Sequence, residues 1–370
     1  MASPVADPSL SPPRDETAAS PQPQTSAGPS NDILPGDHWT QQPVEPAADN
    51  DGDSSYDSDN ASSTASLTSS ILEYRTIQGR TYHSDRVSNG EYWGPNDDKQ
   101  NVAMDIIHHG LMLALDGKLF KAPLDMHKVK KVLDVGTGTG LWAIDFADEY
   151  PDVEVIGTDI SPIQPGWVPP NLFFEIEDMT QPWTFGENTF DFVHMRYLFG
   201  SVPDWNALFK EAYHALQPGG FIETLEADAL IFAEDGTIAD GSPLDQWGKV
   251  FIEGGKKFGR SFSVVNEDLQ RKAIEAAGFT NIVQWDFNSP ITGWSADKKL
   301  KEIGTYGHLS LEQDMDGMVL YMFKEVMGWS SPEIMAYIAH LRRQLRDKSV
   351  HPCCKLRMVY AQKPFDAPVS

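Results

Sequence analysis

The middle of the chain alternates short apolar runs with segments of helical periodicity. The apolar runs predict strands at 132–135, 153–160, 172–176, 190–195 and 221–225. Segments with one apolar face predict helices at 141–150 and 204–216, and Asp204 is the expected N-cap of the second helix. Strands that alternate with helices in this way predict an α/β fold with a mostly parallel sheet and helices on both faces.

The segments on either side of this core have different patterns. Before it, apolar residues at helical spacing predict a helix that begins after Asn96 as N-cap and ends at Gly117. The prolines of 161–171 exclude a helix after the second strand and predict a loop. After the core, the pattern predicts a helix at 267–277, a strand at 282–287, helices packed over the sheet at 290–350 and a last strand at 359–362.

The first 68 residues have no regular hydrophobic pattern. They are rich in proline, serine, alanine and aspartate, and Trp39 and Tyr56 are their only aromatic residues. With so little apolar surface to bury, we expect this tail to be disordered. The sequence therefore predicts a disordered tail (1–68), an N-terminal lid segment with its helix (69–130), a binding core (131–289), and C-terminal helices with a final strand that complete the same domain (290–370).

Charge and composition exclude several classes of protein. The 370 residues carry a net charge of −25, which argues against binding of nucleic-acid phosphates through the overall field. No apolar run reaches the roughly 18 residues that a membrane span needs. The only cysteines, Cys353 and Cys354, are adjacent, which indicates a reducing compartment rather than a disulfide framework. We expect a cytoplasmic protein, with the nucleus as the alternative, and no direct contact with nucleic acid or membrane.

The first predicted strand leads into a glycine-rich loop, VLDVGTGTG. A Walker phosphate loop would need a lysine after its last glycine, where Leu141 stands instead. A dinucleotide fingerprint has GxGxxG spacing, whereas Gly136, Gly138 and Gly140 occupy every second position. The backbone of this shorter loop can approach a compact ligand and present its amides, with the N-terminus of the next helix, to a carboxylate.

Acidic residues mark the strands around this loop. Asp134 lies in the strand before it, Asp159 ends the second predicted strand, and Glu177 and Asp178 follow the third. S-adenosylmethionine carries a carboxylate, an ammonium group, two ribose hydroxyls and an adenine amino group. Asp134 can meet the ammonium group, Asp159 the ribose and Asp178 the adenine, because open parallel sheets bind ligands at the carboxyl ends of their strands. The order of these acids predicts S-adenosylmethionine as cofactor, and we expect no metal site.

Several phrases of the chain carry a family resemblance. They are the segment from KVLDVGTGTG to EIEDM (131–179), SSILEYRTIQGRTYHSD (69–85), FDFVHMRYLFGSVPDW (190–205) and VYAQKP (359–364). In these phrases the chain resembles the fungal LaeA-like, TAM-domain methyltransferases, a branch of the class I S-adenosylmethionine-dependent enzymes, over roughly residues 65–364.

The resemblance implies a fold and a set of cofactor residues. The fold is a Rossmann-like class I methyltransferase sheet of seven strands whose last strand is antiparallel. The positions that match the family's cofactor site are Asp134, Gly136, Gly138, Gly140, Asp159 and Asp178. Tyr82 matches the family's N-terminal GRxYH element, which implies a lid that folds over the cofactor.

No catalytic dyad is visible, which suits a reaction whose methyl group is already activated on the cofactor. His194, at the end of the fourth predicted strand, is the best candidate for a general base, and the alternative is a structural histidine bonded to a neighbouring loop. Arg196 would bind an acidic acceptor or pair with Asp191, and we favour the pairing. Glu226 is expected at a solvated strand end. His108 and His109 are expected in the core beside their helix, with a catalytic role as the alternative.

No pattern names the acceptor, so more than one function remains open. We favour a methyltransferase that acts on a small-molecule acceptor in fungal secondary metabolism, because the phrase DISPIQP (159–165) is typical of the wider methyltransferase set. The alternative is a LaeA-like nuclear regulator that acts with velvet-type protein partners, although no basic nuclear-import run stands out in the tail. A cofactor-binding protein without transfer activity is the third interpretation.

Overall fold

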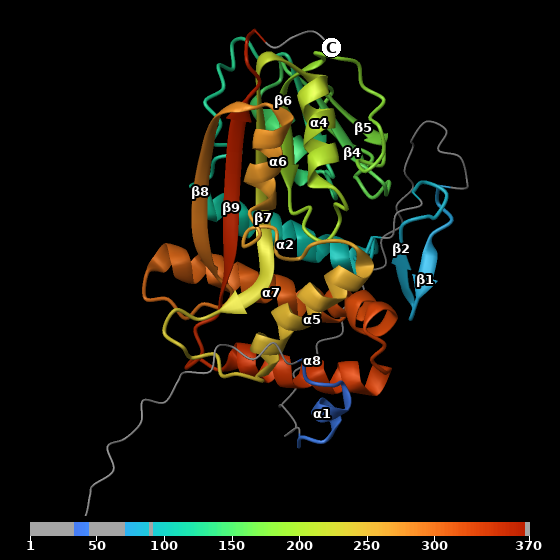
Figure 1. Ribbon diagram of the computed structural model, residues 1–370, viewed down its shortest axis with the longest axis vertical. Helices are drawn as coiled ribbons and strands as arrows, with labels where there is room; N and C mark the ends of the chain where they lie inside the picture. Colours follow the sequence, from blue (N-terminus) through green and yellow to red (C-terminus); the bar gives the residue numbers. More distant parts are fainter. Residues whose placement is uncertain (1–32, 44–70, 89–91, 367–370) are drawn as a thin grey trace, which may run out of the picture. The chain divides into compact units, whose positions relative to one another are not determined.

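A sheet of seven strands forms the centre of the protein. The computed structural model describes residues 33–43, 71–88 and 92–366. The strands are β3 (Lys131–Val135), β4 (Glu154–Asp159), β5 (Leu172–Ile176), β6 (Phe190–Arg196), β7 (Leu216–Phe232), β8 (Thr280–Pro290) and β9 (Cys353–Gln362). Their order is β5-β4-β3-β6-β7-β9-β8, and β9 alone runs opposite to the other six strands (Figure 1). The predicted class I methyltransferase fold is confirmed.

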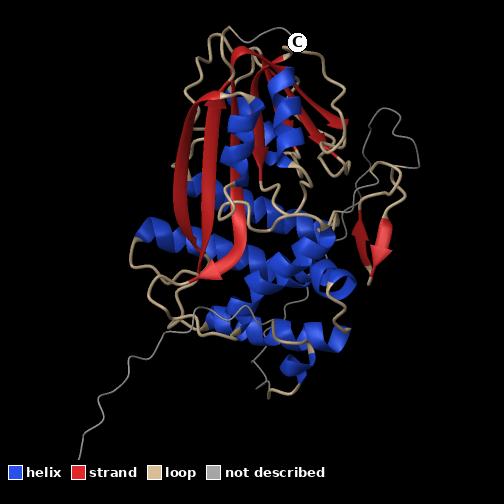
Figure 2. Ribbon diagram, in the orientation of Figure 1, coloured by secondary structure: helices blue, strands red, loops and turns tan. Residues whose placement is uncertain are grey.

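Helices cover both faces of this sheet (Figure 2). On one face, α3 (Leu141–Glu149) packs Trp142 and Phe146 against the strands. On the other, α4 (Trp205–Ala215) and α6 (Leu269–Ala277) share a second core cluster with residues of the alternate strand positions. The predicted N-cap of α4 is confirmed, because the side chain of Asp204 accepts hydrogen bonds from two backbone amides of its first turn.

β7 is much longer than the predicted strand at 221–225. It continues to Phe232 because the acids that interrupt its apolar pattern are buried with backbone partners. Glu226, expected at a solvated strand end, is fully buried and accepts the amides of Leu198 and Phe199. Asp228 likewise accepts hydrogen bonds from the backbone amides of Val265 and Asn266. β7 therefore extends beyond β6, and this extension pairs with β9 as far as Phe232.

A group of helices, here the helical cap, lies at the end of the sheet to which β7 points (Figure 1). It comprises α2 (Asp98–Ala114), α5 (Pro243–Phe258), α7 (Lys298–Leu320), the π-helix η1 (Tyr321–Val326) and α8 (Ser331–Arg346). The prediction that residues 290–350 pack over the sheet is wrong for most of this segment: α7 packs mainly against α2, and α8 against α1, α5 and α7. Their apolar faces form a core of their own, since aromatic residues of several cap helices pack together. None of the helices among the described residues is long and apolar enough to cross a membrane.

The ends of α2 differ slightly from the prediction. Asp97, rather than Asn96, is the N-cap, and its side chain accepts the amide of Gln100. The Asn96 side chain donates to Ser161 Oγ instead. The helix ends at Ala114, and Gly117 closes the following turn with a φ of +74°.

Part of the N-terminal tail is ordered, so its predicted disorder is wrong for residues 33–43. The short helix α1 (Asp37–Thr40) carries Trp39, which is 1% exposed and packs edge-on against Tyr337 of α8 at 5.2 Å between ring centroids. The Leu34 amide donates to Gln246 of α5. Trp39 packs into the cap with Ile33 and Leu34 beside it, because the helical cap supplies the apolar surface that the tail lacks. The rest of the tail lies outside the described residues.

A two-stranded hairpin of β1 (Arg75–Ile77) and β2 (Arg80–Tyr82) precedes α2. Arg80 joins it to the helical cap, because its guanidinium pairs with both Asp97 and the fully buried Asp314 of α7. These ion pairs therefore join the hairpin to the helical cap.

Candidate active site

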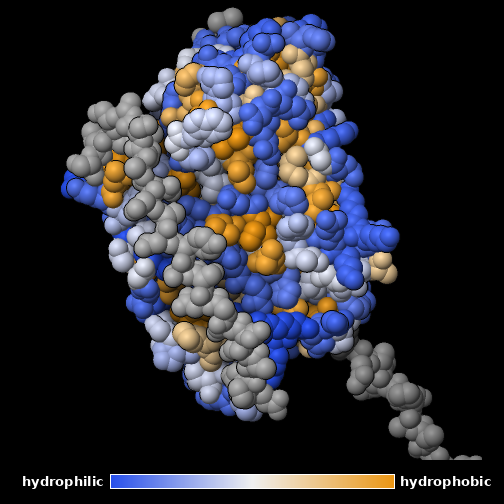
Figure 3. Space-filling model, turned by 180° about the vertical axis from the view of Figure 1, so that it is seen from behind, coloured by the Kyte–Doolittle hydropathy of each residue, from blue (hydrophilic) through white to orange (hydrophobic). Residues whose placement is uncertain are grey.

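A cavity of about 350 Å³ lies where the carboxyl ends of the parallel strands meet the helical cap. Seen from behind, hydrophobic side chains gather at the level between the sheet and the cap (Figure 3). The glycine loop and the ends of β4 and β5 form one side of the cavity. α2, α5, α7 and the extension of β7 form the other side.

The glycine loop is shaped by left-handed backbone and by two aspartates. Gly136 and Gly138 have φ values of +66° and +59°, in the region that glycine adopts without strain. Asp134 accepts the Thr137 hydroxyl at 2.6 Å, and Asp159 accepts the Gly138 amide at 2.9 Å. The two acids thus anchor the loop to β3 and β4 and remain part of the cavity wall.

Asp159 and Asp178 are held in place by backbone amides and hydroxyls. Asp159 also accepts the Ser161 amide, and burial raises the pKa of its carboxyl to about 6. Asp178 accepts the amide and hydroxyl of Thr180, and its second oxygen accepts the hydroxyl of Ser88 at 2.6 Å. A carboxylate oxygen has more than one lone pair, so both acids keep capacity for ligand hydroxyl or amino groups.

The predicted cofactor residues and the predicted base His194 divide into two sets. Those that line the cavity are Asp134, Gly136, Gly138, Asp159 and Asp178, and those that are not among its lining residues are Tyr82, Gly140 and His194. Gly140 caps α3 with a φ of +85°, and a side-chain Cβ in its place would collide with the ring of Phe174. This third glycine therefore packs against β5 and has no open path to a ligand.

His194 lies behind the cavity wall. It is 2% exposed, its ring stacks on Trp142 at 3.7 Å between centroids, and its Nδ1 lies 2.7 Å from Asp134 Oδ1. Burial lowers the pKa of its imidazole, despite the neighbouring carboxylate. In this arrangement the ring holds Asp134 and has no open face toward an acceptor.

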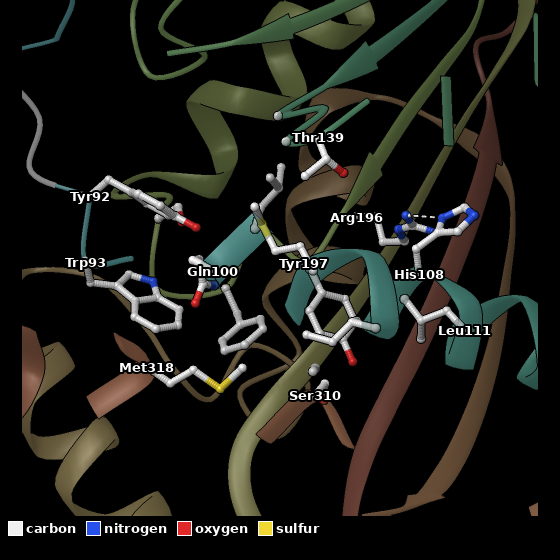
Figure 4. Close-up of a pocket in the computed structure, with 18 of the residues that line it drawn as sticks. Tyr92, Trp93, Gln100, His108, Leu111, Thr139, Arg196, Tyr197, Ser310 and Met318 are labelled. Carbon is white, nitrogen blue, oxygen red and sulfur yellow. Dashed lines mark hydrogen bonds between the residues drawn. The ribbon is translucent and has the colours of Figure 1, made fainter. Parts of the chain in front are cut away.

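Tyr82 is fully buried in the helical cap, where its ring packs against Tyr321. The N-terminal segment contributes other side chains to the cavity, namely Ser88, and Tyr92 and Trp93, which Figure 4 shows. No sequence pattern pointed to Ser88, whose contact with Asp178 joins distant parts of the chain.

Arg196 does not form the pairing that we favoured. Asp191 lies at the opposite end of β6, where it accepts the amides of residues 130 and 131. The guanidinium of Arg196 lines the cavity and donates to His108 Nδ1 at 2.9 Å (Figure 4). His108, for which we favoured a core role over a catalytic one, thereby belongs to the site.

The side of the cavity away from the glycine loop, here the acceptor chamber, is largely apolar. Side chains that line it include Leu111, Phe199, Ala229, Trp247, Phe251 and Met318. Tyr197, directly after β6, and Ser310 of α7 bring hydroxyl groups to it (Figure 4). These residues come from segments far apart in the chain, so no local motif announces them.

The residues present fit S-adenosylmethionine. A Cβ at Gly138 would have only Met104 Sδ as a neighbour, at 3.8 Å, so the missing side chain leaves room for a ligand beside the loop. Asn96 Oδ1 and Gln100 Oε1, on residues that line the cavity, are buried acceptors without a partner, ready for ligand donors. Over the described ranges, no cluster of three or more His, Cys, Asp or Glu side chains could hold a metal ion.

Comparison with known proteins places this site in a family. The sequence model of a family described as "Methyltransferase domain" matches residues 110–284. The chain is 34% identical to methyltransferase pytC of Aspergillus terreus over 308 residues, which cover 83% of this chain and 93% of that protein. It belongs to the LaeA-like methyltransferase family.

Other LaeA-like relatives carry different descriptions. The secondary metabolism regulator LAE1 of Cochliobolus heterostrophus is 33% identical, over 77% of this chain and 94% of that protein. The probable methyltransferase tdiE of Emericella nidulans is 30% identical, over 78% of this chain and 90% of that protein. The predicted family, the methyltransferase activity and the use of S-adenosylmethionine by that family are confirmed.

Proposed function

We propose that the protein transfers a methyl group from S-adenosylmethionine to a small, largely apolar acceptor molecule in fungal secondary metabolism. The observation that carries the proposal is one continuous set of lining residues. It joins the glycine loop and its acids to the apolar acceptor chamber. The likeness to pytC and tdiE supports the same conclusion. We further propose that the sheet and the helical cap are one domain, since β7 runs through both.

The chain's own residues bind and orient the two reactants in this proposal. Bound S-adenosylmethionine supplies a methyl group on a sulfonium, which is a good leaving group. Asp134 would accept the ammonium group and Asp159 the ribose hydroxyls, and Asp178 lies where the adenine amino group would be met. The apolar side chains of the helical cap exclude water and align the acceptor. We infer that His194 positions Asp134 instead of acting as a general base.

Calorimetric titration with S-adenosylhomocysteine tests the cofactor assignment. Wild-type protein is expected to bind it, and Asp159→Ala to bind at least about tenfold more weakly, because two ribose hydroxyls lose an ionised acceptor. Asp152→Ala is the matched control, since Asp152 is exposed in the turn before β4. Equal affinity of all three proteins would overturn the assignment.

A regulator of secondary metabolism is the second candidate function, and the 33% identity to LAE1 favours it. In that case velvet-type protein partners and a nuclear location would be expected, whereas a pathway enzyme would work in the cytoplasm. Metabolite profiles of a deletion strain distinguish the two. One product that lacks a methyl group supports the enzyme, and the loss of several unrelated product families supports the regulator.

A further inference from the structure

Arg196 brings a positive charge to the wall of the cavity. It is the last residue of β6, at the carboxyl end of the sheet, and its guanidinium lines the cavity. One of its terminal nitrogens lies 2.9 Å from Nδ1 of His108, as the dashed line in Figure 4 marks. The other N–H groups of the guanidinium have no such partner among the described residues.

The contact with His108 does not neutralise this charge. A guanidinium can only donate, so Nδ1 of His108 must be the unprotonated nitrogen. The Nε2–H then donates to Asp145 Oδ2, 3.0 Å away on α3. His108 is therefore a neutral ring that holds the arginine at one end and Asp145 at the other. The His108 ring separates the Asp145 carboxylate from the guanidinium, and the Asp145 side chain is 48% exposed.

The acids that line the cavity are engaged elsewhere. Asp134 pairs with His194, Asp159 and Asp228 accept backbone amides, and Asp178 accepts the groups of Ser88 and Thr180. Among the residues that the structure describes, no carboxylate lies within 4.0 Å of the guanidinium nitrogens of Arg196. The cavity thus contains a cation without a counter-ion from the chain itself.

An enclosed cation in this state favours an anionic ligand. Burial lowers the pKa of Arg196, which means that the protein environment destabilises the charged guanidinium. A charge removed from water is stabilised when an opposite charge with matching hydrogen bonds is placed beside it. The planar guanidinium presents parallel N–H groups, and a carboxylate presents two oxygens at the same spacing.

We propose that Arg196 is the carboxylate-binding residue of this cavity, and that His108 and Asp145 position its guanidinium. The inference rests on the proposed methyltransferase function and deepens it. The carboxylate would come from one of two sources: the methionine end of the methyl donor or an acidic acceptor. In the second case the protein would act on carboxylic acids.

Ligand binding to Arg196→Met tests the proposal and separates the two sources. Three probes are used: S-adenosylhomocysteine, its analogue with hydrogen in place of the carboxylate, and benzoate added to the protein saturated with S-adenosylhomocysteine. Arg271→Met is the matched control, because Arg271 of α6 is partly exposed, is not among the residues that line the cavity, and its loss changes the net charge equally. Thermal unfolding of each variant verifies that the fold is retained.

A donor carboxylate gives one expected pattern. Removal of the carboxylate weakens binding at least about tenfold in wild type and in Arg271→Met, whereas Arg196→Met binds both nucleosides equally and weakly. An acceptor carboxylate gives another: Arg196→Met binds S-adenosylhomocysteine as wild type does but loses benzoate. The proposal is overturned if Arg196→Met binds all three probes like wild type, or if no probe's carboxylate contributes to wild-type binding. Failure of wild type to bind S-adenosylhomocysteine would instead overturn the proposed function.

Substitution of His108 tests the positioning role. His108→Leu removes the acceptor at 2.9 Å from Arg196 and is expected to weaken the carboxylate-dependent part of the affinity. His108→Gln offers an amide oxygen in its place and is expected to restore that part. Binding of the carboxylate-free analogue should be equal in both variants. If both variants lose affinity for that analogue as well, the role of His108 is structural and the positioning claim fails.

Discussion

Neighbouring glycines of the loop serve different purposes. A Cβ on Gly138 would face the cavity, with only the Met104 sulfur near it. A Cβ on Gly140 would enter the ring of Phe174, which belongs to β5. The same short motif therefore combines room for a ligand with close packing of two strands. The sequence predicted the loop but could not separate these purposes, because the distinction depends on a residue 34 positions further along the chain.

The packing role of Gly140 predicts a large loss of stability on substitution. Gly117→Ala is the control, because Gly117 also has a positive φ but open space at the Cβ position. The control is expected to lower the free energy of unfolding by about 1 kcal/mol, for backbone strain alone. Gly140→Ala should lower it by about 3 kcal/mol, since the ring must also move. Urea denaturation measures both, and equal losses would contradict the packing role.

Glu226 shows how an acidic residue can mislead sequence reasoning. A lone acid near the end of an apolar run suggests a solvent-exposed side chain, yet here two backbone amides donate hydrogen bonds to the buried carboxyl group. Burial still raises the pKa of its carboxyl to about 8. The folded protein therefore holds this proton more tightly than the unfolded chain does.

This shift predicts a stability that falls with pH. The contribution of Glu226 is fully present below the unfolded pKa of 4.5 and is lost as the pH rises to about 8, because the native state must give up a proton that it favours. The free energy of unfolding should decrease between pH 5 and pH 8, and Glu226→Gln should flatten this decrease. Glu302→Gln, at an exposed position of α7, is the control. An unchanged slope in Glu226→Gln would refute the assignment.

At the scale of elements, periodicity predicted which segments are strands or helices but not where they pack. An apolar helix face indicates that something covers it, without saying whether that partner is a sheet or another helix. The helices between 290 and 350 were therefore placed over the sheet, whereas α8 packs on other helices. The core strands could be placed from the sequence, because fully apolar runs that alternate with helices are typical of strands buried on both faces of a parallel sheet.

The N-terminal segment 33–43 is held mainly by Trp39, and its removal tests that contact. Trp39→Ala is expected to lower the free energy of unfolding by about 3 kcal/mol, because a fully buried indole is lost from the surface of α8. Trp167→Ala removes the same side chain where it is 91% exposed and should change stability by less than about 0.5 kcal/mol. Similar urea midpoints for the two variants would show that the segment contributes no stability.

At the scale of the whole molecule, the two sides of the cavity differ in how much of them could be predicted. The cofactor side follows from one loop and the acids that end successive strands, so its residues are read in chain order. The acceptor side is assembled from α2, α5, α7 and the extension of β7. No local sequence pattern predicts that these elements lie side by side. Arg196 could be predicted only in part. The sequence indicated its position at the end of a strand but not its partner His108 on α2.

The position of β9 between β7 and β8 has a consequence for the order in which the chain is made. β8 pairs in the sheet with β9 alone, and β9 comprises residues 353–362. A ribosome releases β8 and three further helical segments before that partner exists, so the edges of β7 and β8 stay open until β9 has been made. A stop codon directly before β9 would therefore leave the edges of β7 and β8 exposed, and we expect cells to treat the product as a misfolded protein rather than a shortened enzyme.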